Sequence, residues 1–579
     1  MDIEPNSRRV VAPAQAPSQE LPTISGDRGL DHEERLIFEL GRDGVTGVDL
    51  PEAQIAAARL NGQQRKGAIG LPGLSEPEVI RHYVRLSRMN YAIDAGLYPL
   101  GSCTMKHNPR LNEKMARLPG FGDLHPLAPR SATQGALELI SELMYWLTTL
   151  TGMPAVAMSP KAGAHGELCG LLAIRAAIAA RGEKRPRVLV PASAHGTNPA
   201  TAAFAGFTVD EIPAKGNGHV DAEALKAKLG PDVAAIMLTN PNTCGLFEGE
   251  VIGIAKAVHE AGAYFYCDGA NFNAIAGRVR PGDLGIDAMH INLHKTFSTP
   301  HGGGGPGAGP VVLSAALAPF APLPLLVADG EGFRLIEHRN ELPAGAKPFG
   351  RMCAFHGQMG MFVRALAYML SHGRDGVRQA SEDAVLSANY ILASLKDVMS
   401  APFGDGPCMH EALFDDSFLE GTGVTTLDFA KAMIDEGYHP MTMYFPLVVH
   451  GAMLIEPTES ESKESLDRFI HVLRQLALEA RAGKTGRFAG APRLAPRRRL
   501  DETAAARKPI LRWSEERFAS ANEMVGPFRA TNARSESDGP GTPRKRRNRT
   551  GGGAGIKKAP QESAGPVGSS QGNGRAMAP

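Results

Sequence analysis

The chain has 579 residues, of which 43% are hydrophobic and 21% charged, and this is the composition of a globular protein with two or three domains. Its 62 basic and 61 acidic side chains leave a formal net charge of +1, so no strong overall field favours nucleic acid or an anionic membrane as a partner. The cysteines are scattered without a CxxC pair, so we expect free thiols in a reducing cytoplasm and no metal centre. They are Cys103, Cys169, Cys244, Cys267, Cys353 and Cys408.

The two ends of the chain have compositions typical of disordered segments. Residues 1–29 are rich in Pro, Ala and Ser and are predicted to form a flexible arm, without the apolar core of a secretory or transit peptide. Residues 514–579 hold few large apolar side chains, so burial cannot offset an ordering entropy of roughly 1–2 kcal/mol per residue. We predict a disordered basic tail there, and we interpret its RKRRNR run as a solvated charge cluster in preference to a nucleic-acid or targeting motif.

Short apolar runs alternate with helical patterns between about residues 133 and 330. In chain order the pattern predicts a helix at 165–181, a strand at 187–193, a helix at 221–229, a strand at 234–240, a helix at 250–261, and strands at 263–269 and 289–294. Strands separated by helices indicate an α/β domain with a parallel or mostly parallel sheet that is covered on both faces. Ligands bind such sheets beyond the carboxyl ends of the strands.

The remaining pattern divides the chain into further segments. Residues 30–132 form an N-terminal segment that contains a YPLGSCTMK loop, and residues 133–355 form the large domain. Residues 356–513 contain two long helices and then a smaller C-terminal α/β domain. The uncharged stretch that begins at Pro310 is interrupted by prolines, so it is predicted to form a loop with short elements and no membrane span.

Lys295 is the candidate nucleophile. It follows the apolar run MHINLH and precedes the glycine-dense HGGGGPGAG, so its backbone leaves a predicted strand end for a loop that can approach a ligand closely. A lysine that forms a Schiff base needs a desolvated amine on a rigid backbone, and this position meets both needs. An arbitrary lysine in such a place would be a surface residue, so the interpretation depends on its context.

That context is a series of unusual residues at the other predicted strand ends. Asp268 ends the strand before Lys295, where a carboxylate could keep a pyridine nitrogen protonated. Gly163 precedes a predicted helix in PKAGAHGELCG, where free backbone amides at a helix start make an anion site. His195 in SAHGTNPA could stack on a ring, and Asn240 in TNPNTCG could bond its hydroxyl. Each of these residues alone is more often a turn or capping residue.

The ordered set resembles the aspartate-aminotransferase-like, fold type I pyridoxal-phosphate enzymes. Longer segments are similar to the glycine decarboxylase component (P-protein) of the glycine cleavage system, and more narrowly to subunit 2 of its two-chain bacterial form. These segments include LYPLGSCTMKHNPRLNE, SPKAGAHGEL, SAHGTNPATAAF, LTNPNTCGLFEGE, DGANFNAIAGRVRPGDLG, NLHKTFSTPHGGGGPGAGP and MLIEPTESESKESLDRFI. The resemblance extends from about Glu33 to Trp513.

The resemblance implies glycine as substrate, pyridoxal 5'-phosphate as cofactor, carbon dioxide as product and the lipoyl arm of H-protein as acceptor of the aminomethyl group. It also implies a separate subunit 1, in a heterotetramer with two subunits of each kind. Lys295 would carry the cofactor, Asp268 would hold the ring nitrogen and His195 would stack on the ring. The phosphate and remaining ring contacts would come from Gly163, Ala164, His165, Asn240, His294 and Thr296.

The YPLGSCTMK loop has two equally weighted interpretations, a substrate entrance lined by Ser102, Cys103 and Thr104 or a packed interface. Two other functions also stay open. One is another fold type I amino-acid decarboxylase or desulfurase, and the other is a non-catalytic subunit that binds a partner. The intact Lys295 and Asp268 argue against the second.

Overall fold

A computed structural model describes residues 34–48, 51, 57–63, 65–67, 69–301, 307–404, 406–495 and 499–512. The predicted arm at 1–29, the predicted tail at 514–579 and the glycines within 302–306 lie outside these residues. The helices and strands below all belong to the unit Met1–Pro509; a second unit covers Ile510–Pro579.

Seven strands form the main sheet, in the order β1-β7-β6-β5-β4-β2-β3. They are β1 (Ala155–Ala157), β2 (Arg187–Pro191), β3 (Thr208–Ile212), β4 (Val233–Thr239), β5 (Tyr264–Asp268), β6 (Ala288–His290) and β7 (Val311–Leu313). Strand β7 runs antiparallel to both its neighbours, and the other adjacent pairs are parallel. The prediction of a mostly parallel sheet is therefore confirmed.

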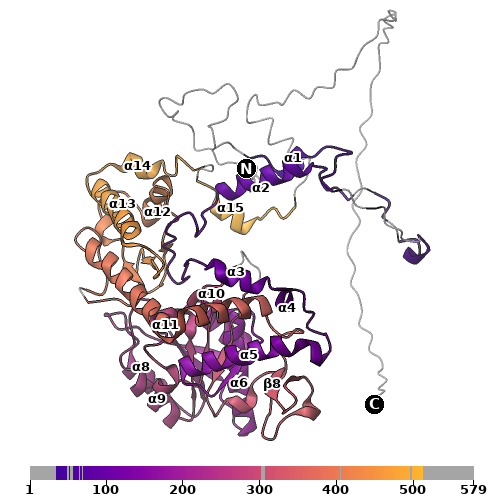
Figure 1. The fold of residues 1–579 in the computed structure, drawn as a ribbon. Helices are drawn as coiled ribbons and strands as arrows, with labels where there is room; N and C mark the ends of the chain where they lie inside the picture. Colours follow the sequence, from indigo (N-terminus) through magenta and orange to yellow (C-terminus); the bar gives the residue numbers. More distant parts are fainter. Residues whose placement is uncertain are drawn as a thin grey trace, which may run out of the picture. The chain divides into compact units, whose positions relative to one another are not determined.

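Each face of this sheet has its own hydrophobic core. Alternate residues of β4 and β5, such as Ile236 and Phe265, pack in the core that contains residues of α5 (Arg130–Thr151), α8 (Ala222–Lys228) and α9 (Val251–Glu260). Met237 and Tyr266 point to the opposite face, which α6 (Gly163–Ala180) and α7 (Thr197–Phe204) cover. Because both faces are buried, β4 and β5 are apolar along nearly their whole length. Figure 1 shows α5, α6, α8 and α9 near one another in the lower part of the view.

The predicted elements of this region are confirmed except at one end. The strand predicted at 289–294 was wrong beyond His290, where β6 ends; the chain then forms the short helix α10 (Leu293–Thr296). A continuous apolar run does not distinguish a strand from a buried helical turn, and Leu293 is fully buried in the turn.

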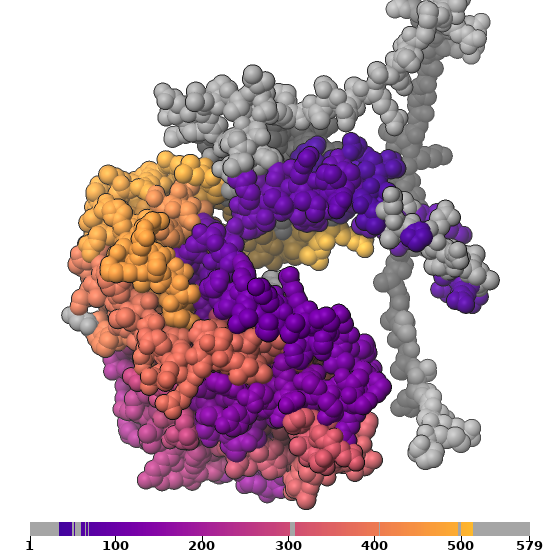
Figure 2. Space-filling view, viewed as in Figure 1, coloured from indigo at the N-terminus to yellow at the C-terminus, as the bar shows by residue number. Residues whose placement is uncertain are grey.

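The long helix α11 (Met359–Leu395) leads from the main sheet to the C-terminal part of the unit. It is two helices joined at Gly373, whose φ of 64° and ψ of −175° interrupt the helix, so the predicted pair is confirmed. The distant helices α3 (Arg110–Ala116) and α5 both pack against α11. In Figure 2 their purple surface adjoins the orange surface of α11.

A second, antiparallel sheet follows in the order β10-β12-β11. Its strands are β10 (Ala412–Phe414), β11 (Thr442–Met443) and β12 (Met453–Ile455), and its helices are α12 (Thr426–Asp435), α13 (Lys463–Arg481) and α14 (Thr485–Ala489). They enclose a separate core, and the three helices lie together in Figure 1. The Ser462 side chain accepts from the Ser465 N–H and so caps α13. The domain boundaries remain predictions.

The sequence did not predict a hairpin of β8 (Leu325–Ala328) and β9 (Phe333–Ile336), although it predicted short elements after Pro310. The other helices are α1 (Ile37–Leu40), η1 (Ala57–Leu60), α2 (Glu76–Arg88), α4 (Pro119–Gly122), η2 (Gly269–Ala274), η3 (Pro281–Leu284), η5 (Ala318–Phe320), η6 (Arg339–Glu341), η7 (Ser417–Leu419) and α15 (Glu502–Arg507). Among the described residues, none of the helices combines the length and the apolar character that crossing a bilayer requires.

Candidate active site

A cavity of about 180 Å³ lies where β4, β5 and β6 end. Its lining combines these strand ends with the first turn of α6 and with α10. Seven residues that the sequence analysis selected line it: Ser102, Gly163, Ala164, His195, Asp268, His294 and Lys295. The chain therefore brings residues that are up to 193 positions apart to one site at the carboxyl edge of the sheet.

Lys295 is the only lysine or arginine among the residues that line this cavity. It lies in α10, which Leu293 and Phe297 anchor in the core because both are fully buried. Only 8% of Lys295 is exposed, and its Nζ donates to the Ser102 carbonyl at 2.6 Å. A short helix held by its apolar residues thus fixes the amine at the cavity, where little solvent reaches it.

Asp268 faces the same cavity from the end of β5. Its two oxygens accept from the Asn198 side chain and the Ala270 N–H, both at 2.9 Å, and His290 Nε2 lies 3.4 Å from one of them. Burial acts to raise the pKa of Asp268, but the charge of His290 and the two donors outweigh it and lower the pKa. Asp268 is therefore held as a carboxylate despite being buried.

Sequence reasoning missed His290 and Asn292, which form the wall between Asp268 and Lys295. His290 Nδ1 lies 2.6 Å from the Tyr266 hydroxyl, so the ring is held from one side while its other nitrogen faces Asp268. A signal was present, since both are polar residues within the otherwise apolar start of the MHINLH run (289–294). Of the polar residues in this run, only His294 was selected.

The first turn of α6 forms a glycine-lined cradle. A Cβ on Gly163 would lie 2.7 Å from Asn292 Oδ1 and 3.1 Å from His290 Nε2, so a side chain there would close this corner. The leading amides of a helix lack partners within the helix and attract anions. The side chain of His165 points elsewhere: its Nδ1 accepts from the Lys161 N–H at 3.2 Å, and it does not line the cavity.

His195 lies at the exposed mouth of the cavity, four residues after β2. Its Nδ1 is 2.9 Å from the Thr197 hydroxyl, which in turn donates to Glu167 at 2.7 Å. Phe445 contacts the ring edge to face, with centroids 5.5 Å apart. These contacts fix the imidazole plane at the entrance.

Asn240 and Thr296, the other residues selected for the cofactor, lie outside the cavity lining, as do Cys103 and Thr104 of the YPLGSCTMK loop. The Asn240 side chain accepts from the Glu248 N–H at 3.0 Å, while its neighbours Thr239 and Thr243 line the cavity. Thr296 is buried, and its carbonyl accepts from Lys106. Their roles toward a ligand remain predictions.

His294 is a neutral member of the lining. Burial, together with the charges of His301 and Lys295, lowers the pKa of His294 to about 3. Its ring meets that of His301 edge to face at 4.8 Å. It can therefore act as a hydrogen-bonding group near neutral pH but does not supply positive charge.

The YPLGSCTMK loop contributes both to the cavity and to the packed interior, while its role as a substrate entrance stays a prediction. Ser102 lines the cavity, whereas Lys106 is buried and donates to Glu459 at 2.6 Å and to the Thr296 carbonyl at 2.8 Å. Burial raises the pKa of the Cys103 thiol, even though the charge of Lys295 acts in the opposite direction. The thiol form of Cys103 is therefore favoured, and the loop is both a wall and an interface.

The lining residues fit a pyridoxal-phosphate cofactor. Asn292 Oδ1, His294 Nδ1 and Glu167 Oε2 are buried without a hydrogen-bond partner among the described residues, and all three residues line the cavity. The hydroxyl of the cofactor ring can donate to an acceptor oxygen of this kind, and its phosphate can accept from the neutral His294 ring. The glycine cradle, the carboxylate and the lysine then lie on separate walls, as the parts of this ligand require.

Comparison with known proteins places the chain in a family. It is 73% identical over 493 residues to probable glycine dehydrogenase (decarboxylating) subunit 2 of Caulobacter vibrioides, covering 85% of this chain and 94% of that protein. The chain belongs to this family. The subunit 2 protein of Desulforamulus reducens is 49% identical over 492 residues, with coverage of 83% and 100%. Family profiles for aminotransferase class-V and for the glycine dehydrogenase C-terminal domain match residues 171–305 and 380–493.

Solved structures show the same fold. A glycine decarboxylase (P-protein) of the glycine cleavage system aligns with a TM-score of 0.60 at 22% identity, covering 72% of this chain and 94% of that one. A glutamate decarboxylase of Lactobacillus brevis aligns with a TM-score of 0.55 at 15% identity, covering 75% and 96%. The predicted fold type I architecture of pyridoxal-phosphate-dependent enzymes is therefore confirmed. The subunit 2 family is that of glycine cleavage P-proteins, so the predicted enzyme class is confirmed as well.

Proposed function

We propose that this subunit 2 chain binds pyridoxal 5'-phosphate and, with its subunit 1, decarboxylates glycine and transfers the remaining aminomethyl group to the lipoyl arm of H-protein. The observation that supports this most directly is the placement of Lys295 and Asp268 on one cavity at the carboxyl edge of the sheet. The name of the family implies a subunit 1. A heterotetramer with two subunits of each kind, and a cytoplasmic location, are part of the proposal.

Four kinds of contact to the cofactor would come from the residues that line the cavity. Lys295 would bond it covalently, Asp268 would face the ring nitrogen and His195 would cover the ring from the mouth. The first turn of α6, with Gly163 and Ala164, would hold the phosphate. When bound, the cofactor supplies an electron sink for the pair of electrons that decarboxylation leaves on carbon.

The chain's own residues would supply position and charge. Asp268 remains ionised because its pKa is lowered, so its negative charge is available to a protonated ring nitrogen. The buried location of Lys295 limits the access of water to its amine. When no cofactor is bonded to it, the Lys295 amine donates to the Ser102 carbonyl at 2.6 Å.

The atoms of the proposed reaction balance. Glycine loses its carboxyl group as carbon dioxide, and the electron pair left on its α-carbon forms a bond to one sulfur of the lipoyl disulfide. The sulfur–sulfur bond breaks, and the second sulfur is reduced to a thiolate that takes up one proton. The disulfide is thus the oxidant, and no cysteine of this chain is required.

The test is a carbon dioxide release assay with [1-¹⁴C]glycine and the chain loaded with pyridoxal phosphate. We expect release only when both subunit 1 and lipoylated H-protein are present, and no release with H-protein that lacks the lipoyl group. Release that is independent of H-protein would favour a simple amino-acid decarboxylase and contradict the proposal. No release in the complete mixture, from a chain that has bound the cofactor, would favour a non-catalytic subunit.

A further inference from the structure

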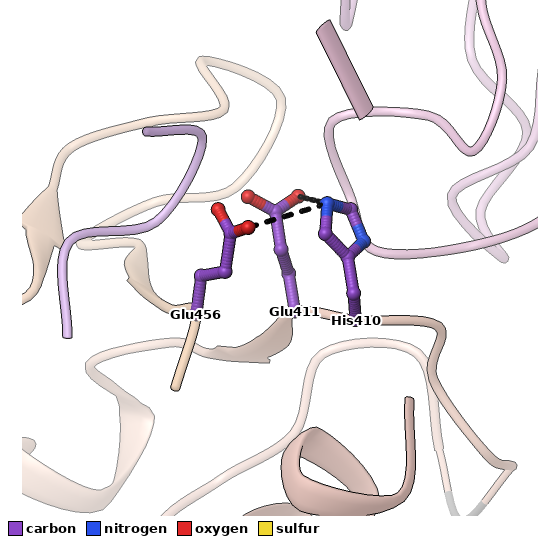
Figure 3. A group of neighbouring side chains, drawn as sticks. All are labelled: His410, Glu411 and Glu456. Atoms are coloured by element: carbon purple, nitrogen blue, oxygen red, sulfur yellow. Dashed lines mark ion pairs between the residues drawn. The ribbon is translucent and has the colours of Figure 1, made fainter. Parts of the chain in front are cut away.

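Three fully buried side chains lie behind the YPLGSCTMK loop, and the proposed reaction uses none of them. His410 and Glu411 precede β10, and Glu456 follows β12; all three are 0% exposed. Strands β10 and β12 are hydrogen-bonded neighbours, with Ala412 paired to Ile455, so the two carboxyl groups arise side by side. Figure 3 shows the two carboxyl groups next to each other and the imidazole of His410 turned toward them.

Each carboxyl group uses one oxygen to hold the same loop. Glu411 Oε1 accepts from the Ser102 N–H, and Glu456 Oε2 accepts from the Thr104 N–H at 2.9 Å. Ser102 and Thr104 have left-handed φ values of 65° and 44°, which residues other than glycine adopt at a cost. The two acceptors therefore stabilise a backbone conformation that the loop sequence does not favour by itself.

The remaining oxygens, Glu411 Oε2 and Glu456 Oε1, have no hydrogen-bond partner among the described residues. His410, Glu411 and Glu456 each place one ligand atom within 4.8 Å of those of the other two. His410 Nε2 is 4.0 Å from the first and 3.8 Å from the second, too far for a hydrogen bond. The carboxyl groups can satisfy these oxygens by bonding to each other, and this requires a proton between them.

The charges in this region favour such a proton. Burial and the neighbouring Glu456 raise the pKa of Glu411 well above its usual range, while burial lowers the pKa of His410. Two ionised carboxylates placed face to face without water are unfavourable, and paired carboxyl groups in proteins resolve this by sharing one proton. A neutral His410 does not supply a compensating charge.

Ser102 connects the carboxyl pair to the amine of Lys295. The N–H of Ser102 donates to Glu411, and the carbonyl of the same residue accepts from Lys295 Nζ at 2.6 Å. A Cβ on Gly101 would lie 2.6 Å from the Leu454 carbonyl, so the loop lies directly against β12 at this point. The direction of the Ser102 carbonyl is thus fixed from the C-terminal sheet.

We propose that Glu411 and Glu456 are positioning residues that share one proton and thereby hold the Ser102 carbonyl against the amine of Lys295. The proposal rests on the proposed function only in taking Lys295 as the cofactor lysine. The shared proton itself is a property of the folded chain.

The test compares Glu411→Gln, the double variant Glu411→Gln with Glu456→Gln, and the exposed control Glu420→Gln in the full chain. A single glutamine imitates the protonated acid, because its oxygen can accept from Ser102 while its amide donates to Glu456. Two glutamines whose oxygens accept from the loop N–H groups turn their amide NH2 groups toward each other, and neither NH2 group can accept.

The first measurement is the stability of the cofactor-free chain as a function of pH. The pKa of Glu411 is raised in the folded chain above its unfolded value of about 4.3, so the folded state keeps a proton that the unfolded state loses. The unfolding equilibrium constant should therefore increase up to about tenfold per pH unit from that value toward the folded pKa. Glu411→Gln should remove this contribution, and Glu420→Gln should not.

Other titratable groups face the pair, and the difference between variant and wild type removes their common contributions. These groups are Cys103, Cys244, Lys295, His301, Cys408, His410 and Glu459.

The second measurement is the dissociation constant of pyridoxal phosphate, followed by visible absorbance. We expect the double variant to bind at least tenfold more weakly than Glu411→Gln.

Three results would overturn the proposal. They are equal pH dependence in the wild type and Glu411→Gln, equal cofactor binding by the single and double variants, and one divalent metal per chain that co-purifies with the wild type but not with Glu411→Gln. The stability measurement needs neither glycine nor H-protein. It therefore succeeds or fails independently of the carbon dioxide assay.

Discussion

At the scale of single residues, the side chains of Lys295 and Asp268 line one cavity, whereas the side chain of Asn240 bonds to the Glu248 N–H outside its lining. Lys295, Asp268 and Gly163 were selected because each stands at a strand end or a helix start, and all three line the cavity. Asn240 was selected by the same rule but bonds to Glu248 outside the lining. A rule based on position in the sheet does not specify which way a side chain turns, because that depends on packing with distant residues.

The carboxylate of Asp268 allows a direct test of its charge. Asp268→Asn keeps the shape of the side chain and removes the negative charge, so the turnover number should fall by about 100- to 1,000-fold, as when one preorganised electrostatic group is removed. Steady-state kinetics of glycine decarboxylation with H-protein would measure this. The exposed Asp283→Asn should leave kcat within about twofold, and a similar kcat for both variants would refute the role of Asp268.

The buried ion pair of Lys106 with Glu459 should be important for stability. Lys106→Met leaves Glu459 buried without its cation, which should cost about 3–5 kcal/mol of unfolding free energy. Urea unfolding measures this cost. Lys106→Met combined with Glu459→Gln should recover a large part of it, because no unpaired charge remains; a double variant as unstable as the single one would contradict this reason.

The same pair predicts a dependence on acid. Lys106 and Asn273 outweigh the effect of burial and lower the pKa of Glu459 below its unfolded value of about 4.3. Its contribution to stability is therefore present above that value and is lost as the pH falls through the folded pKa. The double variant should lose less stability than the wild type between pH 5 and pH 3, as measured by thermal unfolding.

At the scale of helices and strands, the prediction was accurate where periodicity and burial agree. Strands β2, β4 and β5 and helices α6, α8 and α9 lie where apolar runs and amphipathic patterns predicted them. The prediction failed at α10, because one turn of buried helix and the end of a strand have the same apolar pattern. The structure places His294, predicted in a strand, and Lys295, predicted in the loop after it, in one short helix, but both stay at the same edge of the sheet.

Two helix glycines give opposite expectations for the same substitution. Gly253 in α9 has nothing within 4 Å of an added Cβ, so Gly253→Ala should raise the unfolding free energy by about 0.5–1 kcal/mol. In α6, a Cβ on Gly170 would lie 2.6 Å from the Tyr266 ring, so Gly170→Ala should lower it by about 1–3 kcal/mol. Chemical denaturation measures both, and changes of the same sign would show that the packing of α6 on β5 is not as described.

At the scale of the whole chain, the contacts that complete the site join segments that are far apart in the sequence. Ser102 reaches Lys295 across 193 positions and Glu411 across 309. Local patterns contain no information on such pairings, which is why sequence reasoning left the YPLGSCTMK loop between two interpretations. The resemblance to P-proteins supplied the function, whereas the structure supplied the arrangement of the loop between the two sheets.

The most direct test of the account identifies the lysine that bonds the cofactor. The chain is loaded with pyridoxal phosphate, reduced with borohydride, digested and mapped by mass spectrometry. We predict one pyridoxyl group per chain on Lys295, and none on Lys106, the other buried lysine near the cavity. A stable label on Lys106 or another lysine, with Lys295 unmodified, would contradict the account.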